Sequence, residues 1–216
     1  MTSTMRLVKE PKQQRSRETL AYILQATVEV ITDSEDGSFS LRAVAERAGI
    51  SQGTLYARFP TRDELLAYVH HDLWESNRRA VEAWADAEPA LAADDRAALE
   101  RLVRSAIASY ADHMRAKRPV VYALSRAMHH APRLAVRQRE ESVRQIQRVG
   151  DVARRALAGR WTPALAARFE LATRIVVGLV RDSSLHGPTD PAIMRLATPE
   201  LVERLTPIVM GLLVEA

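Results

Sequence analysis

The sequence predicts an all-α protein, and three observations support this fold class. Apolar residues recur at helical spacings of three and four along most of the chain, and no sustained period-two alternation occurs. Alanine and leucine, both strong helix formers, are abundant. Glycine is sparse, with eight in 216 residues, while prolines divide the chain into segments of helical length. We therefore expect about nine helices joined by short turns.

The first three helices are expected between residues 16 and 59. Residues 16–32 place an apolar stripe on one helical face, formed by Leu20, Ile23, Leu24, Thr27, Val28 and Ile31. Turn-forming residues at 33–38 predict a loop. Ser40 is then expected to cap a short helix that ends at Gly49, because glycine tolerates a left-handed backbone. Ser51 caps the third helix, which runs to Phe59.

Further helices are expected along the rest of the chain. Pro60 ends the third helix, and Thr61 with Glu64 forms a capping box that opens the fourth. The expected segments are roughly 62–87, 94–117, 119–130, 133–158, 163–185 and 199–215. Thr162 and Thr198 each place a capping hydroxyl before a proline at the first helical position. Pro207 is expected to kink the last helix.

The charge of the chain is concentrated at its N-terminus. The net charge is +4, and residues 1–17, with five basic residues against Glu10, account for all of it. A short cationic arm before a balanced body suggests a polyanionic partner. The alternative is a tail with no such role.

Composition excludes several classes of protein. The longest apolar run, residues 208–214, is too short to cross a membrane, and no secretory signal precedes the first helix. With no cysteine, disulfides, thiolate catalysis and cysteine-ligated metals are excluded, and a cytoplasmic location is the default. The histidines lack metal-ligand spacing, and no phosphate-binding loop or nucleophile elbow occurs. We therefore expect neither an enzyme nor a metal or cofactor.

Residues 40–59 have the pattern of a helix-turn-helix, in which a glycine-bearing turn sets one short helix across another. The apolar positions suited to a small core are Phe39, Leu41, Val44, Ala45, Ala48, Ile50, Leu55, Tyr56 and Phe59. The second helix leaves small and polar residues outside this core, namely Ser51, Gln52, Gly53, Thr54 and Arg58. A helix with such an N-terminal turn can enter the DNA major groove, where its first residues contact base edges.

The segment FSLRAVAERAGISQGTLYARFPTRDELL, residues 39–66, resembles the DNA-binding region of TetR (tetracycline-repressor-like) transcriptional regulators. The resemblance covers about residues 15–68. It implies a three-helix DNA-binding head with a helix-turn-helix and a larger helical body for ligand binding and dimerisation. On this basis the expected divisions are a flexible basic arm at 1–14, a DNA-binding domain at 15–61 and an effector-binding and dimerisation domain at 62–216.

The resemblance also assigns roles to residues of the head. Ser40 matches a phosphate-contacting hydroxyl, Gln52, Gly53 and Thr54 match a base-contacting turn, and Tyr56 matches a backbone-contacting tyrosine. Arg58 and Arg62 depart from the family pattern, where an aromatic residue or histidine and a lysine are usual. Both keep or add positive charge and can bind phosphate. The full expected DNA-binding set is Arg15, Arg17, Ser40, Ser51, Gln52, Gly53, Thr54, Tyr56, Arg58 and Arg62. Tyr56 has a second interpretation, as a residue of the small core.

The body is assigned less sharply. Aromatic, soft or polar residues suited to an effector site are Trp84, Tyr110, His113, Met114, Tyr122, Arg126, Met128 and His129. By resemblance the last two helices form a homodimer interface, through Phe169, Ala172, Ile175, Val176, Leu179, Leu201, Leu205, Ile208 and Leu212. Such a dimer binds a palindromic operator in double-stranded DNA. The implied function is a repressor released by a small molecule of unknown identity.

Alternatives remain at this point. The same head could serve a DNA-binding regulator with no effector, constitutive or architectural, and a scaffold without DNA binding is a weaker third option. An arginine stripe at residues 133–155 could bind an anionic ligand, a lipid surface or nucleic acid. We favour a solvated face there, because the pairs Arg137–Glu141, Glu140–Arg144 and Asp151–Arg155 have i,i+4 spacing.

Overall fold

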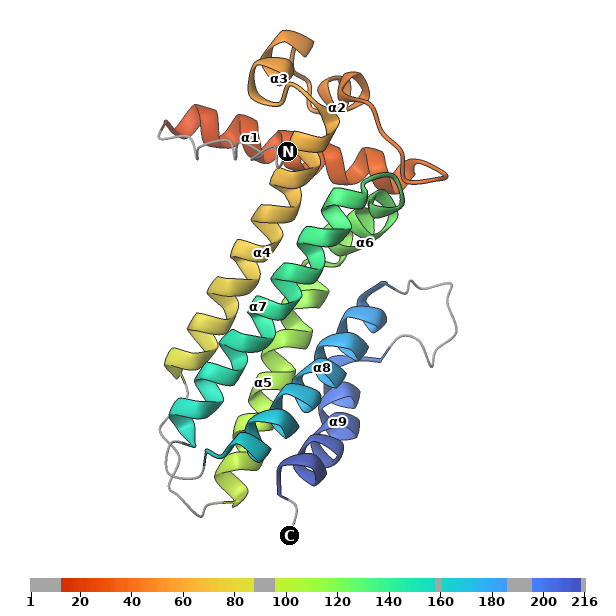
Figure 1. Ribbon diagram of the computed structural model, residues 1–216. Helices are drawn as coiled ribbons and strands as arrows, with labels where there is room; N and C mark the ends of the chain where they lie inside the picture. Colours follow the sequence, from red (N-terminus) through yellow and green to blue (C-terminus); the bar gives the residue numbers. More distant parts are fainter. Residues whose placement is uncertain (1–12, 88–95, 158–160, 186–195, 215–216) are drawn as a thin grey trace. The chain divides into compact units, whose positions relative to one another are not determined.

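The computed structural model describes residues 13–87, 96–157, 161–185 and 196–214, and within these ranges all regular structure is helical (Figure 1). The elements are α1 (Gln14–Asp33), α2 (Leu41–Arg47), α3 (Gln52–Arg58), α4 (Arg62–Ala87), α5 (Arg96–Ala116), α6 (Arg118–Ala127), the 3₁₀ turn η1 (Met128–His130), α7 (Pro132–Ala156), α8 (Pro163–Leu185) and α9 (Thr198–Leu213). The predicted all-α class is confirmed. Residues 1–12, most of the predicted basic arm, lie outside the described residues.

The chain divides into two compact units. The first contains residues up to Trp74 together with Pro119–Arg139, and the second contains Glu75–Arg118 and the residues from Glu140 onward. The boundary falls inside α4 and inside α7, so each of these helices has residues in both units. The boundary expected between a DNA-binding domain at 15–61 and an effector-binding and dimerisation domain at 62–216 is a division by function, and it stays a prediction.

The two predicted ends of α2, a serine cap at Ser40 and a glycine terminus at Gly49, are confirmed. Ser40 Oγ accepts a hydrogen bond from the Ala43 amide at 3.1 Å, and this bond begins α2. At the other end Gly49 has φ +66°, its amide donates to Glu46, and the Ile50 amide donates to Ala45 at 3.1 Å. This pair of bonds is a Schellman motif, which terminates α2 and starts the turn into α3.

Helix α2 packs against both α1 and α3 (Figure 1). Ile23 of α1, Val44 of α2, and Leu55 and Phe59 around α3 are all fully buried. Phe59 packs edge-on against Tyr68 of α4, with 5.6 Å between ring centroids. The core role predicted for Leu55 and Phe59 is confirmed, and the short helices are thereby fixed in one arrangement.

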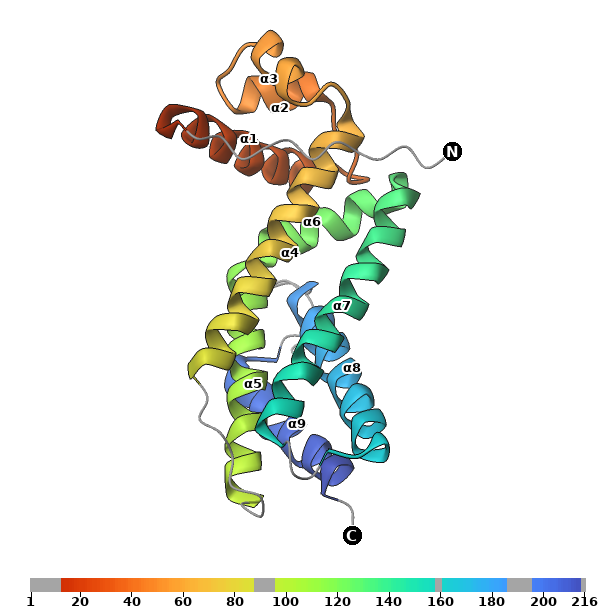
Figure 2. The ribbon, with the colours of Figure 1, turned by 60° about the vertical axis from the view of Figure 1, so that its left-hand side comes forward.

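In the second unit, α5 packs against α8 and α9, and α8 packs against α9 (Figure 2). Near one end of α5, Trp84, Leu102 and Val152 form a buried apolar cluster. The Trp84 indole N–H donates to Ser105 Oγ at 3.0 Å, so its one polar group is satisfied in the core. No helix in the described ranges is long and apolar enough to cross a membrane.

Two helix boundaries differ from expectation. The segment predicted as one helix at 119–130 is α6 followed by the 3₁₀ turn η1. Thr162 does cap α8, accepting from the Leu165 amide at 3.1 Å, but Thr198 does not cap α9. Glu200 Oε2 accepts from the Ala197 amide at 3.0 Å instead, and the Thr198 hydroxyl donates to Asp112 of α5. A carboxylate three residues on therefore replaced the predicted hydroxyl cap.

His70 is a buried histidine of α4 in the first unit. Its Nε2 accepts a hydrogen bond from the Trp74 indole N–H at 3.0 Å and lies 3.1 Å from Gln138 Oε1 of α7. Burial, with a smaller contribution from Arg137 and His71, lowers the pKa of His70 from 6.5 to about 4. The folded state therefore favours the neutral form of the His70 imidazole over the protonated form.

We expect this histidine to make the folded state sensitive to acid. Because the pKa of His70 is lower in the folded than in the unfolded chain, its stabilising contribution is complete above pH 6.5 and is lost as the pH falls towards 4. The loss between pH 7 and pH 4 should be about 3 kcal/mol. Urea unfolding across this pH range should show a shallower pH dependence for His70→Gln than for the unsubstituted chain. Equal slopes for His70→Gln and the unsubstituted chain would contradict the assignment.

Candidate nucleic-acid interface and ligand cavity

The first turn of α3 is exposed and held by its own side chains. Ser51 Oγ accepts from the Thr54 amide at 3.1 Å and lies 2.8 Å from Thr54 Oγ1. Ser51, Gln52, Gly53 and Thr54 are all exposed, and Gly53 adds no side chain to this surface. Because the Thr54 hydroxyl already pairs with Ser51, the amide group of Gln52 and the methyl group of Thr54 are the parts left for an outside partner. Both groups are types that contact base edges in the major groove.

Tyr56 follows this turn and is 45% exposed, between the fully buried Leu55 and the exposed Ala57. Tyr56 thus lies outside the fully buried core that Leu55 and Phe59 enter, and both of its interpretations stay predictions. An exposed phenol hydroxyl beside the first turn is suited to a phosphate oxygen.

Arg58 and Arg62 do not share one environment. Arg58 is half-buried and donates to the Ser16 carbonyl oxygen at 3.1 Å and to Ser16 Oγ at 2.5 Å, which ties α3 to the first turn of α1. Sequence reasoning missed this structural role, since Ser16 is 42 residues away. Arg62 is exposed at the start of α4, with its guanidinium 5.3 Å from the Phe39 ring centroid. The phosphate contacts expected of both arginines stay predictions.

The remaining head residues of the expected set lie at helix starts. Ser40 is exposed but its hydroxyl oxygen caps α2. Arg15 and Arg17 are exposed in the first turn of α1. Two acidic residues of α1 in the head are paired with a base. Arg47 of α2 lies 3.3 Å from Glu29 and 3.0 Å from Asp33. The hydrogen bonds that Arg47 donates to Asp33 and Glu29 raise the pKa of its guanidinium. Helix α3 itself contains no acidic residue, which suits a polyanion.

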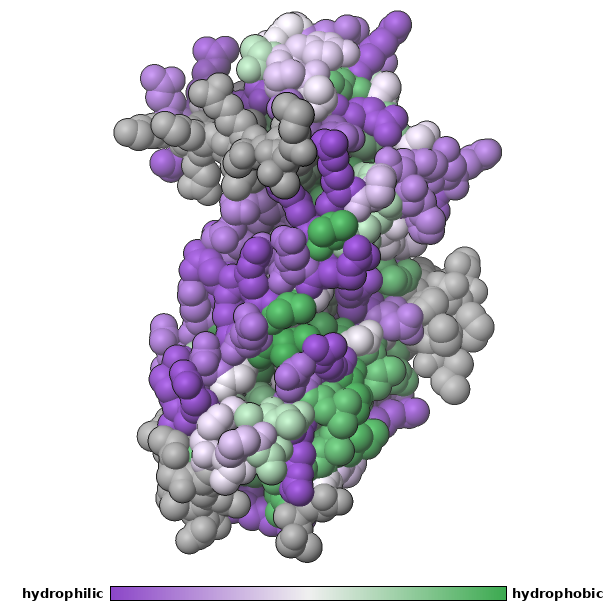
Figure 3. All heavy atoms as spheres, viewed as in Figure 1, coloured by the Kyte–Doolittle hydropathy of each residue, from purple (hydrophilic) through white to green (hydrophobic). Residues whose placement is uncertain are grey.

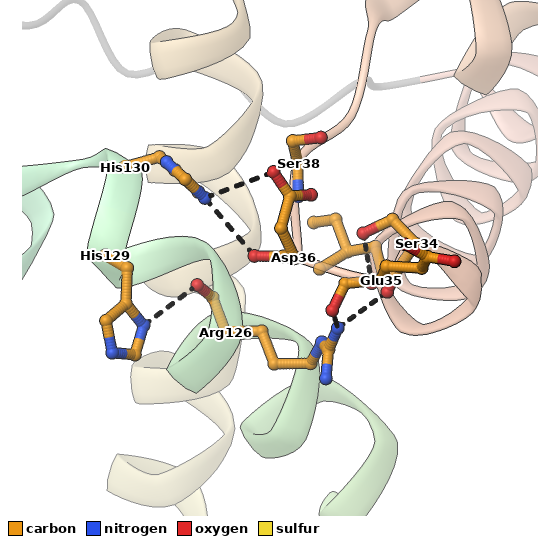
Figure 4. A network of polar contacts seen from close by, with 8 residues as sticks. Ser34, Glu35, Asp36, Ser38, Arg126, His129 and His130 are labelled. Carbon is orange, nitrogen blue, oxygen red and sulfur yellow. Dashed lines mark hydrogen bonds and ion pairs between the residues drawn. The ribbon is translucent and has the colours of Figure 1, made fainter.

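A polar network joins α6 and η1 to the loop between α1 and α2 (Figure 4). The Arg126 guanidinium donates to the Ser34 carbonyl oxygen at 2.6 Å and to the Glu35 carbonyl oxygen. His130 Nε2 lies 3.2 Å from the Asp36 carbonyl oxygen. Hydrogen bonds from Ser38 hold the pKa of Asp36 below its ordinary value. Side chains of α6 and η1 thus fix the segment that leads into the helix-turn-helix.

Half of the predicted effector residues lie in or beside this network, and their ligand-binding role stays a prediction. Tyr122, Arg126, Met128 and His129 all belong to the first unit, on α6 and η1, and none of them lines the cavity described below. Arg126 lies over the Tyr122 ring and His129 contacts the Arg126 carbonyl oxygen. Composition could not separate these residues from true lining residues, because both groups are aromatic, soft or polar.

Gly37 offers a test of this packing. Its φ is +78°, and a Cβ atom there would lie 2.7 Å from Arg126 Cβ and 2.9 Å from the Arg126 carbonyl carbon. Gly49 also has a positive φ, but a Cβ there would meet nothing within 4 Å. We expect Gly49→Ala to cost about 1–2 kcal/mol from backbone strain alone. Gly37→Ala should cost at least about 1 kcal/mol more, because backbone atoms of α6 must move. Chemical denaturation of both variants measures the difference, and equal losses would show that the loop does not pack on α6.

The second unit contains a cavity of about 80 Å³ bounded by α4, α5, α7 and α8, with Val209 contributed by α9. Trp84, Tyr110 and His113 of the predicted effector set line it, and Met114 is a buried core residue beside them. The other lining residues are mostly valine, alanine and leucine, but two buried amides, Asn77 and Gln145, also face it. Neither amide was predicted, since each looks like a solvated position on a charged helix.

The predicted dimer residues separate into buried and exposed sets. Ala172, Leu201 and Leu205 are each 3% exposed, so they belong to the core of the second unit and offer no surface to a second chain. Phe169 and Val176 line the cavity. Leu179 and Ile208 are about half exposed, while Ile175 and Leu212 are partly buried. The interface role predicted for the three buried residues is therefore wrong, because α8 and α9 pack on α5 through the same apolar pattern.

An exposed apolar stripe remains on α8. Leu171, which was not predicted, is 50% exposed and Leu179 is 46% exposed, with Ile175 between them. Spacings of four place these three on one helical face. Figure 3 shows apolar side chains gathered over the region of α8. The i,i+4,i+8 spacing was the signal in the sequence that would have identified Leu171.

Helix α7, which carries the arginine stripe, has ion pairs at Arg144 and at the neighbouring Arg154. Arg144 pairs with Glu140 at 3.7 Å, as predicted, and also with Glu141. Asp151 pairs with Arg154 at 3.2 Å, one residue earlier than predicted. These pairs are exposed, and each contributes little to stability.

The capped, exposed first turn of α3 and its buried support form a helix-turn-helix, a motif whose second helix can enter the major groove of DNA. Residues 23–69 match the family model described as bacterial regulatory proteins, tetR family. Residues 23–69 are therefore similar to the DNA-binding region of this family.

Solved structures support the same fold over nearly the whole chain. A TetR-family transcriptional regulator from Mesorhizobium loti has 17% identity and a TM-score of 0.67, covering 93% of this chain and 98% of its own. A TetR-like regulator from a Rhodococcus species has 22% identity and a TM-score of 0.60, covering 94% and 97%. The fatty acid degradation regulator FadR from Bacillus halodurans has 14% identity and a TM-score of 0.66, also covering 94% and 97%. No curated protein sequence matches this chain.

Proposed function

We propose that this chain is a dimeric, sequence-specific repressor that leaves its operator when a small molecule binds in the cavity of the second unit. The observation that carries the proposal is the exposed first turn of α3, in which Gln52, Gly53 and Thr54 are presented on a rigid, side-chain-capped helix start. Gln52 would hydrogen-bond adenine, and the Thr54 methyl would contact a thymine methyl. Tyr56, Arg62, Arg15 and Arg17 would bind phosphates and fix the register.

Dimerisation would place two such helices on a palindromic site. We assign the interface to the exposed apolar residues of α8 and α9, chiefly Leu171, Leu179 and Ile208. A double substitution Leu171→Glu, Leu179→Glu should weaken the dimer at least about a hundredfold, because it buries unpaired carboxylates at the symmetric contact. Sedimentation equilibrium measures this change. The control Ala97→Glu, at an exposed position of α5, should remain as dimeric as the unsubstituted chain, and a dimer unaffected by the double substitution would refute the interface.

Release of DNA by the ligand would depend on α4. This helix has residues that line the cavity and other residues that belong to the first unit. A ligand shifts the equilibrium only by its differential affinity for the two conformations. A ligand that moves the part of α4 lining the cavity would supply this difference in affinity.

The alternative is a DNA-binding regulator of the same fold with no effector. Binding-site selection from genomic fragments gives the operator, and operator-bound protein is then exposed to small molecules while DNA release and the Tm are followed. Release by a compound that also raises the Tm of the free protein supports the proposal. An operator that stays bound with every compound would favour the alternative.

A further inference from the structure

Three polar side chains that line the cavity have buried atoms without a hydrogen-bond partner. They are Asn77 Oδ1 on α4, His113 Nε2 on α5 and Gln145 Oε1 on α7. Asn77 is 3% exposed and Gln145 only 1%. An unpartnered buried amide oxygen destabilises a fold, and most buried polar atoms in proteins are satisfied. Two such amides facing one cavity therefore point to an outside molecule that completes their hydrogen bonds.

The chemistry of the lining defines what that molecule must offer. The two amide oxygens are acceptors, so they require a hydroxyl or N–H donor. Burial, together with the charges of Lys117 and Arg79, lowers the pKa of His113, which keeps this imidazole neutral near pH 7. Burial likewise raises the pKa of the Tyr110 hydroxyl, which stays protonated. Among the described residues that line the cavity, none carries a full charge.

An ionised ligand would be disfavoured in this cavity. A carboxylate or ammonium group loses its hydration on entry, and no opposite charge in the lining compensates for that loss. The apolar majority of the lining favours a hydrocarbon skeleton, and a hydroxyl group can both donate to an amide oxygen and accept from His113. The larger hollow bounded by α7 and α8, about 280 Å³, differs because it is lined by charged residues, among them the paired Glu170 and Arg174.

We propose that the effector is an uncharged, mainly apolar molecule with one hydroxyl or N–H group, which donates a hydrogen bond to the amide oxygen of Asn77 or Gln145. This inference rests on the proposed ligand-released repressor and specifies its ligand class. Gln145 and Asn77 are then specificity-determining residues. Replacing either by an apolar residue of similar size should remove the binding contact and also relieve an unsatisfied polar group.

The test uses the full chain and matched sets of probes on cyclohexyl, phenyl and naphthyl skeletons, each carrying a hydroxyl, methyl, carboxylate or aminomethyl group. The Tm of the unsubstituted protein should rise most with hydroxyl members. Gln145→Met should itself raise the Tm without a probe by about 2–4 °C and weaken the best hydroxyl probe about tenfold. Asn77→Leu is the second variant, in case the first does not fold. The control Gln147→Met, at an exposed position two residues along α7, should change neither quantity.

The outcomes separate the ligand class from the proposed function. The ligand class is wrong if carboxylate or aminomethyl members give the largest shifts, or if both variants respond to hydroxyl probes as the unsubstituted protein does. If those charged probes also release the operator, the proposal of a ligand-released repressor is supported and only the proposed uncharged ligand class is wrong. If no probe shifts the Tm and none releases the operator, both proposals fail.

Discussion

In the double variant Gln52→Ala, Thr54→Ala, the affinity for the selected operator is expected to fall by roughly three orders of magnitude. Each base contact contributes about 1–3 kcal/mol of discrimination, and a dimer makes each contact twice. Binding to unrelated DNA should hardly change, because nonspecific affinity comes from phosphate contacts. Ser51 keeps its bond to the amide of residue 54 in this variant, so the helix start is preserved.

Fluorescence anisotropy with the operator and with a scrambled duplex, at several salt concentrations, measures this effect. The slope of affinity against salt should be the same for the variant and the unsubstituted protein, since the number of phosphate contacts is unchanged. Gln25→Ala, an exposed glutamine on α1, is the matched control and should bind the operator normally. A double variant with equal losses on both duplexes would show that these side chains do not contact bases.

Phe59→Ala is expected to lower the free energy of unfolding of the DNA-binding head by about 3–5 kcal/mol. The Phe59 side chain is fully buried and packs on Tyr68, so its removal leaves a cavity where α3 meets α4. This loss is a large share of the total stability of an ordinary domain. The variant should therefore lose operator binding because the head unfolds.

The contrasting substitution is Tyr56→Phe, three residues earlier on the exposed side of α3. It removes only a hydroxyl group, so the free energy of unfolding should change by less than about 0.5 kcal/mol. Affinity for the operator and for unrelated DNA should fall together, because a phosphate contact carries no sequence information. Urea unfolding and DNA binding are measured on both variants. A destabilised Tyr56→Phe, or a stable Phe59→Ala, would contradict the division of α3 into buried and exposed faces.

Local chemistry was enough to predict the helix-turn-helix. Ser40, Ser51 and Gly49 act on backbone groups within five residues, and the buried spacing of Leu55 and Phe59 follows from helical periodicity. Thr198 shows where such reasoning fails. Two capping groups, its hydroxyl and the Glu200 carboxylate, were available, and the tertiary contact with Asp112 took the hydroxyl.

The functional residues of the body could be predicted only in part, because packing decides which face of each helix meets a cavity. Trp84 and Arg126 were equally good candidates by residue type, but one lines the cavity and the other holds the loop after α1. Gln145 was hidden in a helix rich in charge, and its 1% exposure follows only from the neighbouring helices. Leu171 is the exception, since its spacing from Leu179 was visible in the sequence.

Selection of bound sites from a random duplex library by the full chain is the most direct test of a dimeric, sequence-specific DNA-binding protein. The expected result is one enriched motif with two-fold symmetry, its half-sites about 34 Å or a multiple of one helical turn apart. Selection with Gln52→Ala should then relax the motif at the same position in both half-sites. A library with no enriched motif, or a motif that Gln52→Ala leaves unchanged, would contradict base recognition by the first turn of α3.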